Sequence, residues 1–205
     1  MLVELLQSVF FTTNPLNNET VSFNKLITRE RLTSFMIIFA HGLEGTPNGS
    51  KIQALRAAGF EVLAPDFQGM ILSERVALLE KICNEHRDKR PLLAGSSYGG
   101  LTAAIIAMRL PEQFSGLLLC APALHLKEDP VSEDTILVAP KGMPTVIIHG
   151  IGDDVVPISC SLEYAERSGS DILQFHKVDD GHRLSESHGS IIEGANALYS
   201  QTIDS

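Results

Sequence analysis

The chain has 205 residues, a length that supports one well-formed hydrophobic core and gives no reason to expect a second domain. Its composition, 44% hydrophobic and 20% charged, is typical of a globular protein and argues against disorder and membrane spans. Acidic residues outnumber basic ones by 25 to 16, giving a net charge of −9 without a basic run. Nucleic acid and anionic membrane surfaces are therefore excluded as expected partners, and residues 1–205 are treated as a single domain.

Cysteine usage and the N-terminus bear on the cellular compartment. Cys83, Cys120 and Cys160 lie far apart in the sequence and form no C-x-x-C pair. This usage predicts buried or half-buried thiols in a reducing compartment, with neither a disulfide framework nor a metal site. The N-terminal stretch MLVELLQSVFF is apolar but carries Glu4 and lacks the basic leader and cleavage site of a signal peptide. We therefore expect an edge strand there and a cytoplasmic protein.

Short apolar runs alternate with helical patterns along most of the chain, after an irregular start in which residues 20–27 are a further candidate strand. This alternation predicts an α/β protein with a three-layer, doubly wound, mostly parallel sheet. Strands are expected at 34–40, 60–65, 91–96, 116–123, 144–150 and 171–178. Helices are expected at 47–58, 72–86 and 98–109, and a closing helix carries Ile191, Ile192, Ala195, Leu198 and Tyr199 on one face.

The longest irregular stretch, residues 124–143, reads LHLKEDPVSEDTILVAPKGM and lies between two predicted strands. A connection of this length is typical of a functional loop or a lid. Half of it is polar and prolines interrupt it, so it is too short for a cap of several helices. We therefore expect a short cap-like insertion.

The stretch LLAGSSYGGLTAA, residues 92–104, places Ser97 between Gly95 and Gly99. A serine at the apex of a tight strand-to-helix turn has a strained backbone, and the neighbouring chain approaches too closely for a Cβ at the flanking positions. The G-x-S-x-G pattern alone has little specificity, and a structural serine in a glycine turn is the competing interpretation. The predicted strand before Ser97 and the predicted helix after it favour a nucleophile.

A nucleophilic hydroxyl needs a base, and the base needs an acid that orients it. The stretch IIHGIGDDVVP, residues 147–157, follows one predicted strand, and DDGHRL, residues 179–184, follows the next. The carboxyl ends of parallel strands meet at one edge of a sheet, so an aspartate of the first stretch and His182 of the second are expected beside Ser97. His182 is preferred among the histidines because it follows the last strand. His41 and His149, which precede glycines at strand ends, are expected to hydrogen-bond loop backbone.

Four blocks of the sequence together resemble the signature blocks of the α/β-hydrolase superfamily, particularly its small bacterial serine esterases. The blocks are HGLEGTPNGSK (41–51), GSSYGG (95–100), HGIGDDVVP (149–157) and DDGHRL (179–184). The likeness extends from residue 35 to about residue 200. It implies the α/β-hydrolase fold and acyl-transfer chemistry.

The resemblance also implies roles for particular residues. Ser97 corresponds to the nucleophile, His182 to the base and Asp153 to the acid of the H-G-x-x-D motif. Its neighbour Asp154 is the competing acid, and would otherwise lie in a turn or cap the next helix. The oxyanion hole of the superfamily corresponds to the backbone N–H groups of Tyr98 and Leu43.

The expected function is that of a serine hydrolase that cleaves small-molecule acyl esters or thioesters through an acyl-enzyme, without a metal or an organic cofactor. The short insertion predicts an open site that prefers short acyl chains; a longer apolar channel would draw on Leu43, Met70 and Ile71. One alternative is a catalytically inactive binding protein of the same fold. Another is a phosphate-binding loop at residues 42–51, but the order Gly49-Ser50-Lys51 departs from the required G-K-[ST]. The sequence assigns no oligomeric state.

Overall fold

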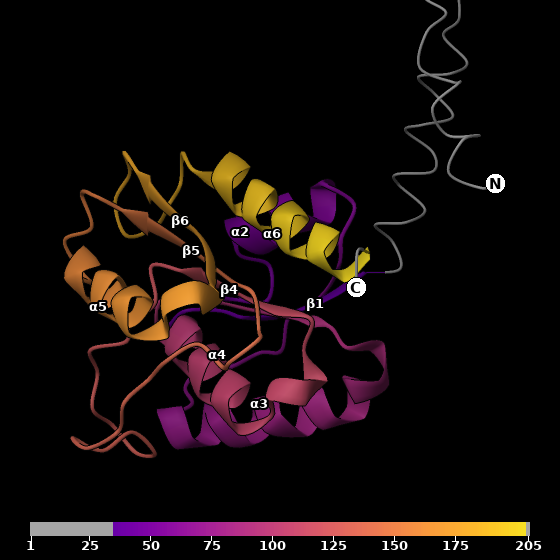
Figure 1. The fold of residues 1–205 in the computed structure, drawn as a ribbon, viewed down its shortest axis with the longest axis horizontal. Helices are drawn as coiled ribbons and strands as arrows, with labels where there is room; N and C mark the ends of the chain where they lie inside the picture. Colours follow the sequence, from indigo (N-terminus) through magenta and orange to yellow (C-terminus); the bar gives the residue numbers. More distant parts are fainter. Residues whose placement is uncertain (1–34, 204–205) are drawn as a thin grey trace, which may run out of the picture.

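The computed structural model describes residues 35–203, and the strands expected at the N-terminus and at residues 20–27 lie outside these residues. A six-stranded sheet in the order β2-β1-β3-β4-β5-β6 forms the centre of the fold, and every neighbouring pair is parallel (Figure 1). The strands are β1 (Met36–Ala40), β2 (Glu61–Leu63), β3 (Leu92–Ser96), β4 (Gly116–Cys120), β5 (Thr145–Gly150) and β6 (Ile172–Val178).

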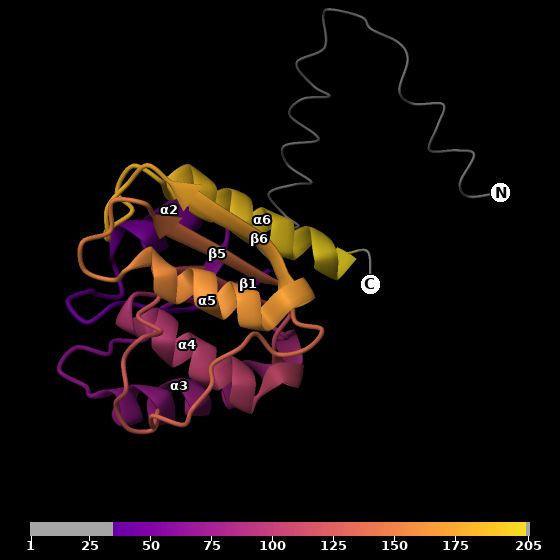
Figure 2. The ribbon, with the colours of Figure 1, turned by 60° about the vertical axis from the view of Figure 1, so that its left-hand side comes forward.

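Helices cover both faces of this sheet, as Figure 2 shows from a second side. The helices are α2 (Ser50–Ala57), α3 (Leu72–His86), α4 (Tyr98–Arg109), α5 (Ile158–Ser168) and α6 (His188–Ile203). One face carries α2 and α6, and the other carries α3, α4 and α5. The three-layer, doubly wound α/β fold expected from the sequence is therefore confirmed.

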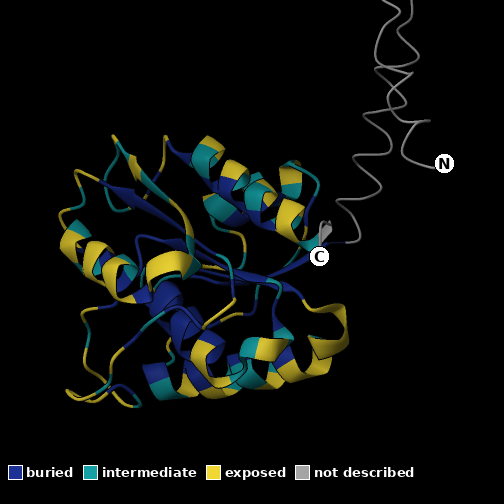
Figure 3. Cartoon of the chain, viewed as in Figure 1, coloured by how far each residue is buried: buried dark blue, intermediate teal, exposed yellow. Residues whose placement is uncertain are grey.

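The sequences of the four central strands, β1, β3, β4 and β5, are almost continuously apolar because both faces of the sheet are covered there. In β1, the side chains of Ile37 and Phe39 enter the core beneath α2 and α6. The alternate side chains of Ile38 and Ala40 enter the core beneath α3 and α4. Figure 3 shows the result: the central strands and the inner helix faces are buried, whereas the edge strands β2 and β6 and the outer faces of the helices are partly or fully exposed.

The expected elements within residues 35–203 are all observed, but β2 and β4 are shorter than the strands expected at 60–65 and 116–123, and β4 ends where Ala121 has a φ of 43°. Two helices differ as well. α3 and α4 have the predicted bounds, whereas α2 begins at Ser50 instead of residue 47, because residues 46–49 form a turn in which Gly49 N donates to Thr46 O. α5 was not among the expected helices. Its buried side chains are Ser161, Tyr164 and Ser168, so the segment has no aliphatic stripe by which to recognise it.

The connection between β4 and β5 contains turns and no helix. Apolar side chains along residues 124–143 are buried against the body of the protein, among them Leu124, Val131, Leu137, Ala139 and Met143. The segment therefore packs against the rest of the domain and does not project from it. Among residues 35–203, no helix has the length and apolar character needed to cross a bilayer.

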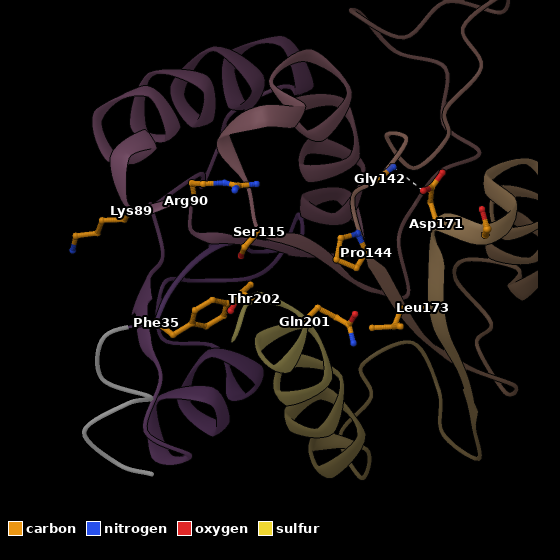
Figure 4. Close-up of a pocket in the computed structure, with 11 residues that line it drawn as sticks. Phe35, Lys89, Arg90, Ser115, Gly142, Pro144, Asp171, Leu173, Gln201 and Thr202 are labelled. Carbon is orange, nitrogen blue, oxygen red and sulfur yellow. Dashed lines mark hydrogen bonds between the residues drawn. The ribbon is translucent and has the colours of Figure 1, made fainter. Parts of the chain in front are cut away.

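A cavity of about 630 Å³ lies at the amino ends of the strands (Figure 4). Phe35 precedes β1, Ser115 precedes β4 and Pro144 precedes β5, so three strand starts contribute to its wall. Lys89 and Arg90, both exposed, lie at its border. None of the side chains singled out in the sequence as catalytic candidates lines this cavity.

Candidate active site

Ser97 occupies the turn between β3 and α4 with a backbone conformation that is rare for a residue other than glycine, φ 55° and ψ −119°. Its N–H donates to the carbonyl oxygen of Cys120 at 2.9 Å, and its own carbonyl accepts from Ala123 N at 3.0 Å and Leu101 N at 3.1 Å. Strain of this kind costs about 1–3 kcal/mol and persists only where the surroundings impose it. Three backbone hydrogen bonds impose it here.

The glycines on either side of Ser97 are required by close approach of the backbone. A Cβ at Gly95 would overlap the carbonyl group of Gly99, and a Cβ at Gly99 would overlap the carbonyl groups of Ala40 and His41. The turn is thus pressed against the end of β1, as its glycines predict. The Ser97 side chain is thereby brought to the carboxyl edge of the sheet.

His182 lies in the loop after β6 and contacts both other members of the expected triad. Its Nε2 atom lies 2.9 Å from Ser97 Oγ, and its Nδ1 atom lies 2.8 Å from Asp153 Oδ2. An ionised carboxylate can only accept, so Nδ1 carries the hydrogen and Nε2 is free to accept from the serine hydroxyl. The His182 side chain is 17% exposed, whereas that of Asp153 is fully buried.

The carboxylate of Asp153 is held by backbone as well as by His182. Its Oδ1 atom accepts from Val155 N at 2.9 Å and Val156 N at 2.8 Å. Burial alone would raise the pKa of this carboxyl, but the hydrogen bonds from Val156, His182 and Val155 outweigh it and the pKa lies below its usual value. Asp153 is therefore ionised at neutral pH, while Asp154 is exposed at the border of the cleft.

Two polar residues for which the sequence predicted no role in the triad, Asp180 and Lys51, shape the loop carrying His182. The carboxylate of Asp180 accepts from the N–H groups of Gly181 and Glu186 and from the hydroxyl of Ser187. Lys51 donates from Nζ to the carbonyl oxygen of Arg183 at 2.6 Å, and burial lowers the pKa of this amine. Lys51 and Arg183 are 132 residues apart, so no local pattern could have revealed the contact.

The loop after β1, which carries Leu43, packs against the serine turn. A Cβ at Gly42 would lie 3.4 Å from the Cβ of Ser97. His41 fixes this loop: its Nε2 accepts from Phe67 N at 3.0 Å, which leaves Nδ1 to donate to Gly42 O at 2.8 Å. The expectation that His41 hydrogen-bonds loop backbone is confirmed.

Arg75, on α3, supports the same loop from beneath. Its side chain is fully buried, and Nη1 donates to the carbonyl oxygen of His41 at 2.9 Å. Nε and Nη2 donate to the carbonyl oxygens of Met70 and Phe67, both at 3.1 Å. The sequence suggests a solvent-facing charge on an amphipathic helix, which is why its role could not be predicted.

A cleft of about 1030 Å³ opens at the carboxyl edge of the sheet, and Ser97 and His182 both line it. Leu43 and Tyr98, the two residues expected to supply oxyanion-hole N–H groups, line it as well. Leu43 is 61% exposed, which leaves the cleft open to solvent. Met70 and Ile71 are not among its lining residues.

Neither a metal centre nor a disulfide is present in the part of the chain that the structure describes. Cys83 and Cys120 are buried and Cys160 is half-buried, as expected from their spacing. Burial raises the pKa of the Cys83 and Cys120 thiols to about 12, so both stay protonated.

The fold and this arrangement of groups are those of an α/β hydrolase, and comparison with known families agrees. Residues 35–142, more than half of the chain, match the family of serine aminopeptidase, S33 (Hydrolase_4). The chain therefore belongs to this family of the α/β-hydrolase superfamily. No curated protein matches the sequence significantly.

Solved structures share the fold at low sequence identity. A hydrolase of the α/β superfamily from Xanthomonas campestris pv. campestris is 24% identical, with a TM-score of 0.67 over 81% of this chain and 99% of that chain. Est1E from Butyrivibrio proteoclasticus with ferulic acid bound is 18% identical, with a TM-score of 0.63 over 83% and 90%. A serine hydrolase without a lid, also from Xanthomonas campestris, is 19% identical, with a TM-score of 0.64 over 80% and 82%.

Proposed function

We propose that this α/β hydrolase cleaves acyl esters or thioesters, with Ser97 as nucleophile, His182 as general base and Asp153 as the acid that orients it. One observation carries the proposal. Asp153 Oδ2, His182 and Ser97 Oγ form a continuous chain with contacts of 2.8 and 2.9 Å, which is the spacing that proton transfer requires.

In the proposed reaction, the Ser97 hydroxyl attacks the acyl carbonyl while His182 Nε2 takes its proton. Asp153, ionised at neutral pH, stabilises the imidazolium that forms. The backbone N–H groups of Leu43 and Tyr98 stabilise the oxyanion. The leaving group takes the proton from His182, and water then attacks the acyl-enzyme with His182 again as base. This sequence of steps needs no metal or organic cofactor.

The open cleft supports a preference for short acyl chains. Leu43 and Val155 line it with largely exposed side chains, and the connection at residues 124–143 contributes only His125 and Leu126 to its wall. Each added methylene therefore gains only part of the roughly 0.8 kcal/mol available from full burial. We propose acyl chains of about two to six carbons as substrates.

Ester chemistry is also what the names of structural neighbours suggest, since one is a monoacylglycerol lipase from Paleococcus ferrophilus. We further propose a cytoplasmic protein of one domain, residues 1–205, with a cap-like insertion at about 124–143. The alternative, an inactive binding protein, would give no reason for the strained backbone of Ser97 or for the alignment of the three side chains.

A substrate screen with purified protein tests the proposal. Esters of p-nitrophenol with acyl chains from two to sixteen carbons are assayed beside acyl-CoA thioesters of the same lengths, and Ser97→Ala supplies the background rate. We expect turnover by the wild type alone, with kcat/KM flat or falling beyond about six carbons. A steep rise toward the longest chains would contradict the short-chain preference, and equal rates in both proteins would contradict the hydrolase mechanism.

A further inference from the structure

His149, the penultimate residue of β5, lies fully buried beside the carboxylate of Asp153. Its Nε2 atom lies 3.2 Å from Asp153 Oδ2 and 3.0 Å from the carbonyl oxygen of Val156. Its Nδ1 atom lies 2.8 Å from Ser161 Oγ on α5. The prediction that His149 hydrogen-bonds loop backbone is confirmed by its contact with the Val156 carbonyl. The contact with Asp153 was not expected.

The partners of the His149 ring determine where its hydrogens lie. A carbonyl oxygen can only accept, so Nε2 carries a hydrogen, which it donates to the Val156 carbonyl. The same nitrogen lies 3.2 Å from Oδ2 of Asp153, which is a close polar contact and not a second hydrogen bond. In the neutral ring, Nδ1 then accepts a hydrogen bond from the Ser161 hydroxyl. Both ring nitrogens are thus bonded within the protein, as burial requires.

Oδ2 of Asp153 therefore lies beside two histidine rings and accepts a hydrogen bond from one of them, His182. His182 Nδ1 lies 2.8 Å away and His149 Nε2 lies 3.2 Å away. The other oxygen, Oδ1, accepts from the backbone N–H groups of Val155 and Val156. Three hydrogen bonds therefore hold the carboxylate, and the His149 ring lies against Oδ2 as a fourth polar contact. The group cannot rotate without losing a hydrogen bond.

We propose that His149 is a positioning residue for the acid of the triad: its buried ring, with Nε2 3.2 Å from Oδ2, keeps Asp153 in line with His182 Nδ1, and the dipole of its N–H bond offsets part of the charge on that oxygen. The inference rests on the proposed function, in which Asp153 orients the base. His149 acts only through Asp153 and does not line the cleft. Because His149 offsets part of the charge on Oδ2, Asp153 stabilises the protonated form of His182 less strongly.

The groups that face the Asp153 carboxylate come from three elements: His149 from β5, His182 from the loop after β6 and Cys160 from α5. Burial raises the pKa of the Cys160 thiol, which therefore remains neutral at physiological pH. The other charged or titratable side chains around the cleft are His41, Glu44, Lys51, Tyr98, His125, Asp154, Asp180 and Arg183. None of these side chains is changed in the His149 variants described below, so they do not account for differences of those variants from the wild type.

Replacement of His149 by phenylalanine removes the Nε2–H and keeps a planar ring of similar size. Oδ2 then interacts with His182 alone, so the imidazolium is stabilised and the acidic limb of kcat/KM moves up by about half to one pH unit. Looser placement of the carboxylate also lowers kcat by about 10-fold to 100-fold, with KM unchanged. His149→Gln, whose amide N–H can reach the position of Nε2, should recover most of both effects.

The experiment compares wild type, His149→Phe, His149→Gln and the control Ser168→Ala. Ser168 is a buried hydroxyl on the same helix as Ser161, and it bonds to Ala139 N and Tyr164 O, away from the acid. The ring of His182 is titrated by NMR in each protein. The rate of labelling by a fluorophosphonate and the pH profile of ester hydrolysis are measured in parallel.

We expect the His182 titration midpoint and the acidic limb to rise together in His149→Phe, to return toward wild type in His149→Gln, and to stay at the wild-type pH in Ser168→Ala. A folded His149→Phe with an unchanged or lower midpoint overturns the proposal.

If His149→Phe does not fold, the reciprocal measurement decides. Asp153→Asn should then shift the NMR signal of the His149 Nε2–H, and Asp154→Asn should leave it in place. An unmoved signal in Asp153→Asn overturns the proposal. These NMR measurements do not require enzyme activity. A wild type that hydrolyses no ester would therefore contradict the proposed function, but the NMR shifts would still test the role of His149.

Discussion

The two ends of the parallel sheet both hold a cavity, but they differ in how their charged groups are held. At the carboxyl end, Asp153 and Arg75 have fully buried side chains, each with at least three hydrogen bonds in fixed directions. At the amino end, Lys89 and Arg90 are exposed beside the cavity of Figure 4. A buried charge is costly unless it is fully hydrogen-bonded, so such groups indicate where precise placement matters. This contrast supports the proposal that the chemistry takes place at the carboxyl end.

The largest expected effect follows from removing the Ser97 hydroxyl at the carboxyl end. Ser97→Ala should lower kcat by about 10³-fold or more because no other group supplies the nucleophile. Ser115→Ala is the matched control at the amino end: its Oγ is buried without a hydrogen-bond partner, so its loss should leave kcat and stability unchanged. Ester hydrolysis rates and thermal melts check both variants. Comparable losses of activity would remove the distinction between the two ends.

The next largest effect separates the two adjacent aspartates. Asp153→Asn should reduce kcat by about 10²-fold to 10⁴-fold, because an amide at this position favours the wrong tautomer of His182. Asp154→Asn should change kcat by less than about threefold, since its side chain is exposed. Steady-state kinetics on folded proteins give the ratio. The reverse order would assign the acid to Asp154.

A third prediction compares glycines at the two ends. Gly99→Ala should destabilise the protein by about 3 kcal/mol or more, because the new Cβ would overlap the end of β1. Gly142→Ala, near the amino-end cavity, meets open space and adds only the strain of its φ of 79°, about 1–2 kcal/mol. Urea unfolding measures both. An equal loss would show that close packing at the serine turn has no special cost.

The smallest expected effect concerns acid stability. The pKa of Asp153 in the folded protein lies below its usual value, so its ionised form stabilises the fold above about pH 4, and this contribution is lost as the pH falls through the lowered pKa. Asp153→Asn should therefore lose less stability than the wild type between pH 5 and the acid range. Melting temperatures across this range test the sign, with Ser115→Ala expected to follow the wild type.

The fold could be predicted because its signals are local. The apolar runs of the strands and the spacing in α3 and α4 can be recognised within single segments, and the order of Ser97, Asp153 and His182 along the chain indicated that they would meet. Contacts between distant polar groups carry no such signal. Lys51 beneath the His182 loop, Arg75 beneath the Leu43 loop and α5 with its polar buried face became evident only in three dimensions.

The most direct test of the central claim is to label the protein with a fluorophosphonate and to locate the adduct by peptide mass spectrometry. This reagent reacts with a serine that a neighbouring base activates. The proposed triad predicts one adduct, on Ser97, that is absent in Ser97→Ala and slow to form in Asp153→Asn. An adduct on another residue, or labelling that persists in Ser97→Ala, would contradict it.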